Sequence, residues 1–236
     1  MNAGNLTYYH CTSDIFLDSI LENGLGKINP NFDLKLLDLL NFVFEIAKIE
    51  MNDETFESLA FSTELMINQE IKYVDKSIYG VDVLNFKHDG VFLSLGDRAA
   101  ITHSHHTKYG SEILTRVMLI VNQLRQKGVR VCIPAELNQI DVESLLLHKP
   151  KPIFIKVLAV DDKYLYNQHD RPLAGTMRFI EEKLKTTSDK VKFAFNNTSV
   201  YKYIKPILVK NIEVYYLDYD GHPIDDDFEY YLTRIN

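Results

Sequence analysis

Apolar residues in this chain occur in short runs, and the spacing inside the runs switches repeatedly between that of a helix and that of a strand. The longest runs, at 36–40 and 117–121, are far shorter than the roughly 20 residues that a membrane span requires. Strand-like and helix-like segments do not alternate regularly, as they do in a doubly wound parallel sheet. With 46% hydrophobic residues among 236, the sequence predicts one soluble α+β domain with its own core.

The same spacing predicts individual elements. Strands are expected at 6–10, 89–94, 117–121, 129–133, 153–160, 191–195, 207–209 and 214–217. Helices are expected from Asp14 to a cap at Gly24, in two runs between 31 and 72 that break at Asn52-Asp53, from a cap at Asp97, and over 177–184. Residues 31–88 then form a helical insertion, in which 75–87 is either a mobile loop over a substrate or a loop packed on the insertion helices. Asp225-Asp226-Asp227 predicts an exposed acidic turn.

Charge and cysteine content narrow the location and the partners. The net charge of −7 gives no general attraction to nucleic acid, so a nucleic-acid substrate would need a local basic patch. Cys11 and Cys132 are the only cysteines, which suits a reducing compartment and makes a poor zinc site. Residues 1–5 have neither a basic flank nor an apolar core, so they do not resemble a secretory signal. We expect a cytoplasmic protein with no membrane partner.

His10 is the first candidate for chemistry. It closes the first predicted strand and is followed by small and polar residues, so its ring and the nearby backbone amides can point into a cleft. Taken alone, the residues leave open a second interpretation, in which His10 is buried and hydrogen-bonded in the core.

The residues around His10 resemble the opening of the ADP-ribosyltransferase superfamily. Tyr9-His10-Cys11-Thr12-Ser13, a helix with Ile20-Leu21, and Gly24-Leu25 are similar to the Y-H-G-T-S…I-L-x-x-G-L pattern of its histidine-type, PARP-like branch. That pattern also occurs in DNA-targeting bacterial toxins of this class and in the related RNA 2′-phosphotransferases. The resemblance implies a split β-sandwich with NAD as the substrate. It further implies that His10 bonds a ribose hydroxyl of NAD and that the backbone of Cys11 holds the nicotinamide amide.

A second segment extends the resemblance. Gly90-Val91-Phe92-Leu93-Ser94, with Ala99-Ala100 downstream, is similar to the family segment that forms the floor of the pocket. Thr12 and Ser94 therefore join His10 and Cys11 among the expected NAD-binding residues. Cys11 stands where the family has glycine, and its side chain is expected to narrow the approach to the nicotinamide ring.

Two residues of the family pattern are missing. The tyrosine that stacks on nicotinamide would lie near Thr102 and His103, so His103 or Tyr109 is expected to replace it. The late-strand glutamate that polarises the ribose would fall within 196–200, where no glutamate lies. Ser199 is expected to take this catalytic place, with Asn197 as the alternative, because Glu213 belongs to the next predicted strand. The missing glutamate argues against polymer formation.

Further charged and histidine residues lie near the presumed pocket. Arg98 and Arg116 suit a pyrophosphate, although most arginines solvate a surface. His103-Ser104-His105-His106 invites a metal interpretation, but adjacent histidines point in different directions and no carboxylate or cysteine follows at a suitable spacing. We expect no metal.

The leading functional hypothesis is a mono-ADP-ribosyltransferase that binds NAD, releases nicotinamide and transfers ADP-ribose to a protein or nucleic acid. Such an enzyme fits the role of a bacterial or phage-defence toxin, whose partner would be an antitoxin or inhibitor protein. The first alternative is a catalytically degenerate module that binds NAD or ADP-ribose. The second is an RNA 2′-phosphotransferase-like enzyme, which needs several arginines to hold its phosphate.

Overall fold

The computed structural model describes residues 6–51, 54–223, 225 and 227–236. Its contacts divide the chain into two compact units. The sheet unit comprises Met1–Ile28, Asp89–Gly110 and Pro150–Asn236, and the helical unit comprises Asn29–His88 and Ser111–Lys149. Three expectations fall wholly or partly outside the described residues: the missing signal at 1–5, the helix break at Asn52-Asp53, and Asp226 of the acidic turn.

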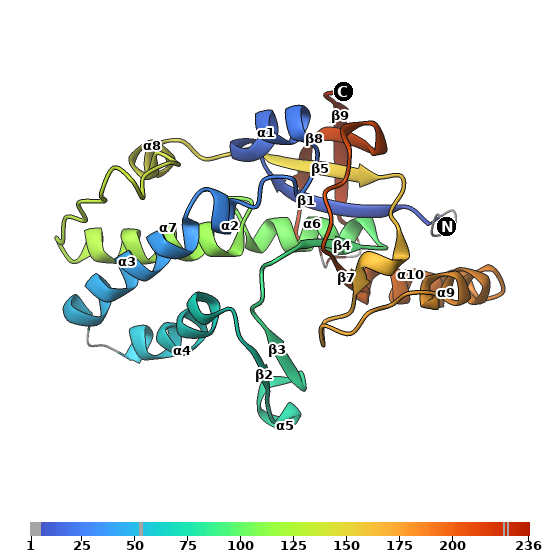
Figure 1. The fold of residues 1–236 in the computed structure, drawn as a ribbon, viewed down its shortest axis with the longest axis horizontal. Helices are drawn as coiled ribbons and strands as arrows, with labels where there is room; N and C mark the ends of the chain where they lie inside the picture. Colours follow the sequence, from blue (N-terminus) through green and yellow to red (C-terminus); the bar gives the residue numbers. More distant parts are fainter. Residues whose placement is uncertain (1–5, 52–53, 224, 226) are drawn as a thin grey trace. The chain divides into compact units, whose positions relative to one another are not determined.

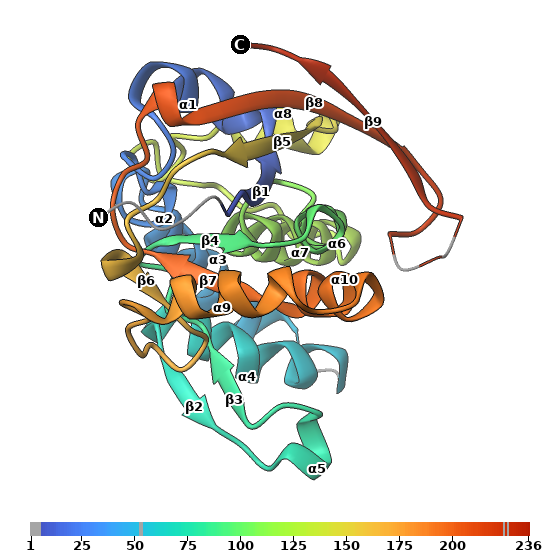
Figure 2. The same cartoon turned by 90° about the vertical axis from the view of Figure 1, so that its right-hand side faces the viewer.

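The sheet unit is built on a seven-stranded sheet in the order β6-β7-β4-β1-β5-β8-β9 (Figure 2). All neighbouring strands in it are antiparallel. The mixed α and β class expected from the sequence is therefore confirmed. The strands are β1 (Tyr8–Ser13), β4 (Val91–Ser94), β5 (Pro152–Val157), β6 (Leu165–Tyr166), β7 (Val200–Tyr203), β8 (Ile212–Asp220) and β9 (Glu229–Arg234).

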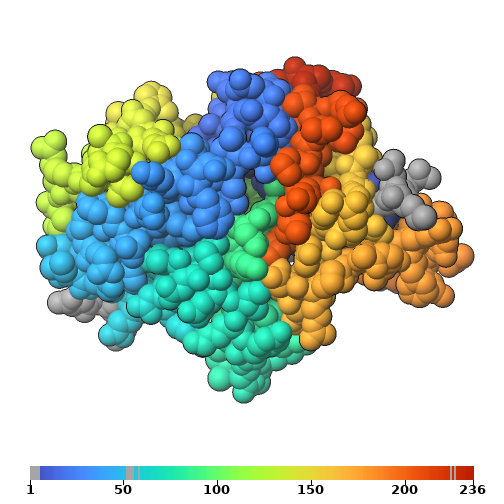
Figure 3. All heavy atoms as spheres, in the orientation of Figure 1, coloured from blue at the N-terminus to red at the C-terminus, as the bar shows by residue number. Residues whose placement is uncertain are grey.

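Helices of the sheet unit connect these strands and cover the sheet. They are η1 (Asp14–Phe16), α1 (Leu17–Asn23), α6 (Asp97–His106), η2 (Asp162–Tyr164), α9 (Thr176–Lys185), α10 (Asp189–Thr198) and η3 (Val209–Asn211). Helix α1 ends at Gly24 as predicted, with φ +86°, and a Cβ there would lie 2.2 Å from the Ile207 carbonyl oxygen. Leu25 then pairs with Ile207, so the blue α1 segment touches the orange-red chain before β8 (Figure 3).

The helical unit packs α3 against α4 and α7 (Figure 1). Its elements are α2 (Pro30–Asp33), α3 (Leu36–Glu50), α4 (Glu54–Asn68), β2 (Ile71–Tyr73), α5 (Lys76–Tyr79), β3 (Val83–Asn85), α7 (Glu112–Gln126) and α8 (Val142–Leu147). The two predicted helical runs are confirmed as α3 and α4, and Leu36, Leu39, Leu40, Val43, Phe44 and Ala47 form the buried face of α3. No described helix is long and apolar enough to cross a membrane.

Four predicted strands are wrong. Residues 117–121 lie in α7, where the buried side chains from Ile113 to Leu124 recur at helical spacing that a five-residue window cannot reveal. Residues 191–195 lie in α10, on which Val191 and Phe193 are exposed, so their alternation with polar residues does not mark a buried sheet face. Residues 129–133 form no strand, and 207–209 supply only the bridge at Ile207.

Two smaller predictions also need correction. Asp97 is the first residue of α6 rather than its cap, because Gly96 has the extended backbone of the cap position. The Asp97 carboxylate accepts a hydrogen bond from the next backbone amide, that of Arg98, at 2.7 Å. The stretch at 75–87 contains α5 and β3, so it is ordered secondary structure rather than a plain loop.

Candidate functional site

Strand β1 is joined very unequally to its two neighbours. Six residue pairs connect it to β5, but only Tyr9 and Ser94 pair across β1 and β4. Immediately beyond that pair, the His10 ring makes the contact to β4, with Nδ1 2.8 Å from the Phe92 carbonyl oxygen. The main-chain ladder between β1 and β4 therefore stops at His10, and a side chain replaces it.

This contact sets the chemical state of His10. A carbonyl oxygen can only accept, so Nδ1 carries the ring hydrogen. Burial lowers the pKa of His10 to about 4, against the opposing effect of the Phe92 carbonyl, and the neighbouring His103 lowers it further. The ring is therefore neutral at pH 7 and its Nε2 is a hydrogen-bond acceptor.

The depressed pKa of His10 makes folding depend on pH. Because the pKa falls from 6.5 to about 4 on folding, the unfolded chain binds more protons between these two values. Stability from this group is thus complete above pH 6.5 and is lost as pH falls toward 4. We expect it to contribute about 2 kcal/mol to the drop in unfolding free energy between pH 7 and pH 4.5. Urea unfolding of the wild type and His10→Asn at both pH values measures this, and equal drops would contradict the assignment.

Cys11 faces away from His10. It is 2% exposed and lies in a core cluster with Ala100, Ile101, Phe154, Leu217 and Phe228. Successive strand residues point to opposite faces of a sheet, so the thiol is not on the His10 side. Burial also raises the pKa of the Cys11 thiol. The expectation that this side chain narrows the approach to a ring beside His10 is therefore wrong.

A substitution can test this orientation of Cys11. Cys11→Gly introduces the residue of the family pattern, and we expect it to lower the unfolding free energy by about 2 kcal/mol, because it leaves a cavity and adds backbone freedom. NAD affinity should change by less than about threefold, which is under 1 kcal/mol. Cys132→Gly, at an exposed position of the helical unit, is the matched control. A large gain in NAD affinity would place the thiol at the site after all.

The loop after α6 lies against the end of β1. The Thr12 hydroxyl donates to the Gly110 carbonyl at 2.8 Å, and a Cβ on Gly110 would lie 2.5 Å from the Ser13 amide nitrogen. The Ser13 hydroxyl is buried there with no hydrogen-bond partner among the described residues. This packing brings Tyr109, the residue before Gly110, to the same end of β1 as Thr12.

The remaining predicted residues of β4 and α6 are placed as follows. His103 lies on α6 within electrostatic range of His10. The buried Ser94 hydroxyl donates to the Gly96 carbonyl at 2.7 Å and so holds the turn between β4 and α6. The Arg98 guanidinium donates to the carbonyls of Asp225 and Phe228. Ser94 and Arg98 thus already serve protein contacts, while His103 and Tyr109 flank β1.

Ser199 stands directly before β7, which pairs with β4. Its carbonyl accepts from the Leu95 amide at 3.3 Å, and its side chain hydrogen-bonds Tyr201, whose pKa burial raises. Asn197 instead ties α10 to α6, because its side-chain oxygen accepts from the Ala99 amide. Glu213 lies on β8, which β4, β1 and β5 separate from β7. Ser199 thus lies beside the start of β7, whereas Glu213 lies on a strand that is not a neighbour of β7.

Two buried charged residues escaped the sequence analysis. Lys202, on β7, is 2% exposed and bonds the Asp89 carboxylate at 2.8 Å as well as contacting Asp170. Glu181, on α9, is 9% exposed and within electrostatic range of Tyr8, whose hydroxyl is buried without a hydrogen-bond partner among the described residues. No local pattern marks either residue, because only tertiary packing buries them.

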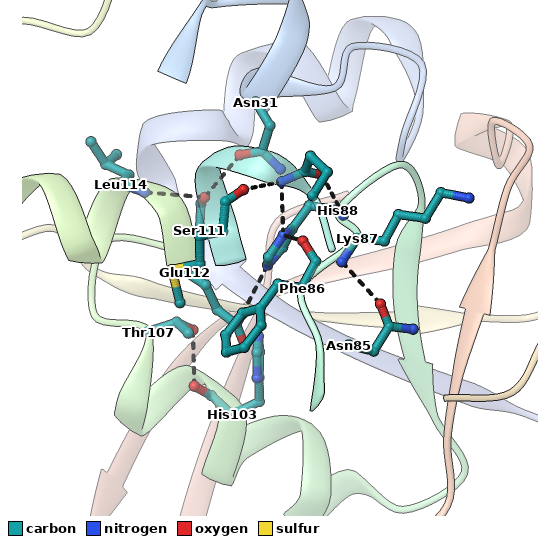
Figure 4. Close-up of polar contacts among 12 residues, drawn as sticks. Asn31, Asn85, Phe86, Lys87, His88, His103, Thr107, Ser111, Glu112 and Leu114 are labelled. Atoms are coloured by element: carbon teal, nitrogen blue, oxygen red, sulfur yellow. Dashed lines mark hydrogen bonds and ion pairs between the residues drawn. The ribbon is translucent and has the colours of Figure 1, made fainter. Parts of the chain in front are cut away.

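The helical unit has a polar cluster of its own, centred on His88 (Figure 4). The ring of this buried residue lies 2.6 Å from the Phe86 carbonyl and 2.9 Å from the Glu112 carboxylate. Elsewhere in this unit the Arg116 guanidinium donates to the Leu59 carbonyl and to two hydroxyls of α4. Arg116 is therefore a structural residue of the helical unit.

Comparisons of this chain with protein-family models, with curated proteins and with solved structures found no match.

Proposed function

We propose that this protein is a mono-ADP-ribosyltransferase that binds NAD as substrate, releases nicotinamide and transfers ADP-ribose to a macromolecule. One observation carries the proposal: a neutral His10, with an acceptor Nε2, stands where the ladder between β1 and β4 ends. Two of the three segments expected to form the pocket include β1 and β4, which are neighbours in the sheet, and the third, 196–200, runs from the end of α10 to the start of β7, which pairs with β4. The weak joint between β1 and β4 supports a split sandwich of the ADP-ribosyltransferase type.

Each residue has a proposed role. His10 Nε2 accepts a hydrogen bond from a ribose hydroxyl, and the Cys11 backbone binds the nicotinamide amide. Tyr109 or His103 stacks on the nicotinamide ring. Thr12 and Ser94 shape the pocket, Arg98 adds positive charge near the pyrophosphate, and Ser199 bonds the ribose in place of the glutamate. The acceptor displaces nicotinamide, which leaves as a neutral molecule with the bonding electron pair, and the acceptor's proton passes to water.

The proposed acceptor is a protein or a nucleic acid. The net charge of −7 favours a protein slightly, because phosphate backbones repel an acidic surface. A cytoplasmic toxin held in check by an antitoxin or inhibitor protein is the biological setting that we propose for this activity.

The direct test is transfer of labelled ADP-ribose. The protein is incubated with NAD carrying a label in the adenylate half, together with a cell lysate, and both transferred label and free nicotinamide are measured. We expect both products from the wild type and from His148→Ala, an exposed histidine of the helical unit, and neither from His10→Ala. Identical background signals from all three proteins would contradict the proposal.

A binding module is the second candidate, because β7 offers Ser199 and no carboxylate at its start. Calorimetry separates the two, since saturable binding of NAD or ADP-ribose without turnover supports the module. The RNA 2′-phosphotransferase alternative is not favoured, because it needs several arginines and groups of α4 already hold the Arg116 guanidinium, which leaves only Arg98 of the two candidates. Removal of the 2′-phosphate from a model oligonucleotide would reinstate it.

A further inference from the structure

Strand β9 forms one edge of the seven-stranded sheet (Figure 2). It pairs with β8 over six consecutive residue pairs without a bulge, whereas β6, at the opposite edge, has only two residues. The only charged residues of β9, Glu229 and Arg234, are at its two ends. The middle of this edge therefore has none of the charges, prolines or bulges that commonly keep an exposed edge from pairing.

Hydrogen bonds fix which backbone groups of β9 face outward. The Ile235 amide donates to the Val214 carbonyl at 2.9 Å, so these two residues form a hydrogen-bonded pair that continues the register of β8 and β9. In an antiparallel ladder, residues of such pairs alternate with residues whose amide and carbonyl point away from the neighbouring strand. The bonds between β5 and β8 give the same alternation along β8. Tyr230, Leu232 and Arg234 therefore direct their amides and carbonyls outward, away from β8.

We propose that β9 pairs with β9 of a second copy of this chain, antiparallel and about a two-fold axis at Leu232. This register places Leu232 opposite its own copy and Tyr230 opposite the partner's Arg234. All three outward residues of each strand then form hydrogen-bonded pairs, and because each of the three pairs exchanges two bonds, six main-chain hydrogen bonds join the copies. A two-fold axis at any other residue leaves at least one outward residue of each strand without a pair inside β9.

The side chains of β9 suit the same register. Residues directly opposite each other in an antiparallel pair lie on the same face of the sheet and contact one another. Leu232, which is 37% exposed, faces a leucine, and Tyr231, which is 58% exposed, faces the partner's Thr233. Arg234 faces the ring of Tyr230, a neighbour that suits a guanidinium, and no two like charges are opposite. The strand is therefore complementary to itself, as a two-fold dimer interface requires.

The proposed interface is small. It uses one six-residue strand from each copy, fewer than the roughly 20–30 residues a side of a standard interface. We therefore expect a reversible dimer with a dissociation constant on the order of 10 μM rather than an obligate one.

The test is sedimentation equilibrium of the full chain between about 1 and about 500 μM. We expect the wild type to pass from monomer to dimer over this range. Leu158→Lys should do the same, because it is the same substitution at a similarly exposed leucine, 44%, directly after β5. Leu232→Lys and Leu232→Asp should each raise the dissociation constant of the dimer by more than about tenfold, because like charges then face each other across the axis. An equimolar mixture of these two variants should return to within about threefold of the wild type, because opposite charges then meet. Circular dichroism shows whether each variant is folded.

Three results would overturn this proposal. One is a wild type that remains monomeric at about 500 μM. Another is a wild-type dimer that a folded Leu232→Lys protein forms equally well, which would place the contact elsewhere on the surface. The last is a mixture of the two charged variants that dimerises no better than either alone, which would exclude an axis at Leu232. None of these measurements involves NAD, so the dimer and the proposed transferase activity are tested separately.

Discussion

Gly110→Ala is expected to lower the unfolding free energy of the sheet unit by about 3 kcal/mol. The backbone of Gly110 has φ +76°, where a side chain is strained. In addition, the new Cβ would lie 2.5 Å from both the Ser13 amide nitrogen and the Thr12 hydroxyl oxygen. The Ser13 nitrogen is a backbone atom of a paired strand and cannot easily shift. The clash is therefore relieved only when the loop moves away from β1. Urea denaturation followed by circular dichroism measures the change.

Gly175→Ala is the matched control for this prediction. Gly175 has nearly the same backbone conformation, φ +78°, in the same unit, but no heavy atom lies within 4 Å of the position of its Cβ. Gly175→Ala should therefore lower the unfolding free energy by about 1 kcal/mol, which is the effect of conformational strain alone. Equal losses in the two variants would mean that the contact of the loop with β1 contributes nothing.

His10→Leu is expected to reduce the rate of nicotinamide release by about 100-fold or more, because it removes the group that positions the ribose. Leucine fills a similar volume but can neither donate to the Phe92 carbonyl nor accept from a hydroxyl. His10→Gln should retain part of the rate, because its amide can donate and accept at once. Initial rates at saturating NAD, together with the NAD dissociation constant, measure the effect.

Ser199→Ala tests the second proposed role separately, because it removes the hydroxyl of the residue directly before β7 without touching β1. If Ser199 replaces the glutamate, this variant should lose turnover while keeping its affinity for NAD. A His10→Leu rate within about threefold of the wild type, in a folded protein, would contradict the role assigned to His10, because that difference is under 1 kcal/mol.

Elements with strong local signals were predictable from the sequence. The first strand is present, although it runs from Tyr8 to Ser13 and not from 6 to 10, so His10 lies within it and does not close it. The short helix after it and the glycine stop at Gly24 are present as predicted. So are β5, α9 and the centre of β8. In each case the apolar spacing and the terminating residue point to the same structure, so tertiary packing had no conflict to resolve.

Short apolar windows did not distinguish a strand from a helix where tertiary packing determines which one forms. The β-branched run at 117–121 is typical of a strand, but in α7 its members other than the exposed Leu119 share a buried face with Ile113 and Leu124. Local β-propensity amounts to about 1 kcal/mol at most. Burying the seven apolar side chains on one face of α7 contributes more than this. The helix therefore prevails.

The candidate site likewise has features that the local sequence indicates and features that only tertiary packing creates. From strand patterns and a family resemblance, both local in the chain, the sequence nominated His10 and Ser199; the structure has His10 inside β1 and Ser199 directly before β7. The sequence did not show that His10 contacts the Phe92 carbonyl or that Gly110 supports β1. Those relations link residues far apart in the chain, and no spacing rule encodes them.

By itself, the sequence determined the class of the fold, the strand that carries His10, and the types of side chain available for chemistry. The tertiary structure decided the neutral state of His10 and the burial of Cys11 on the opposite face. The physical reason is the distance along the chain over which each effect acts. Propensity and periodicity act over a few residues, whereas burial, which removes water from a ring or a thiol, depends on every segment that packs around it.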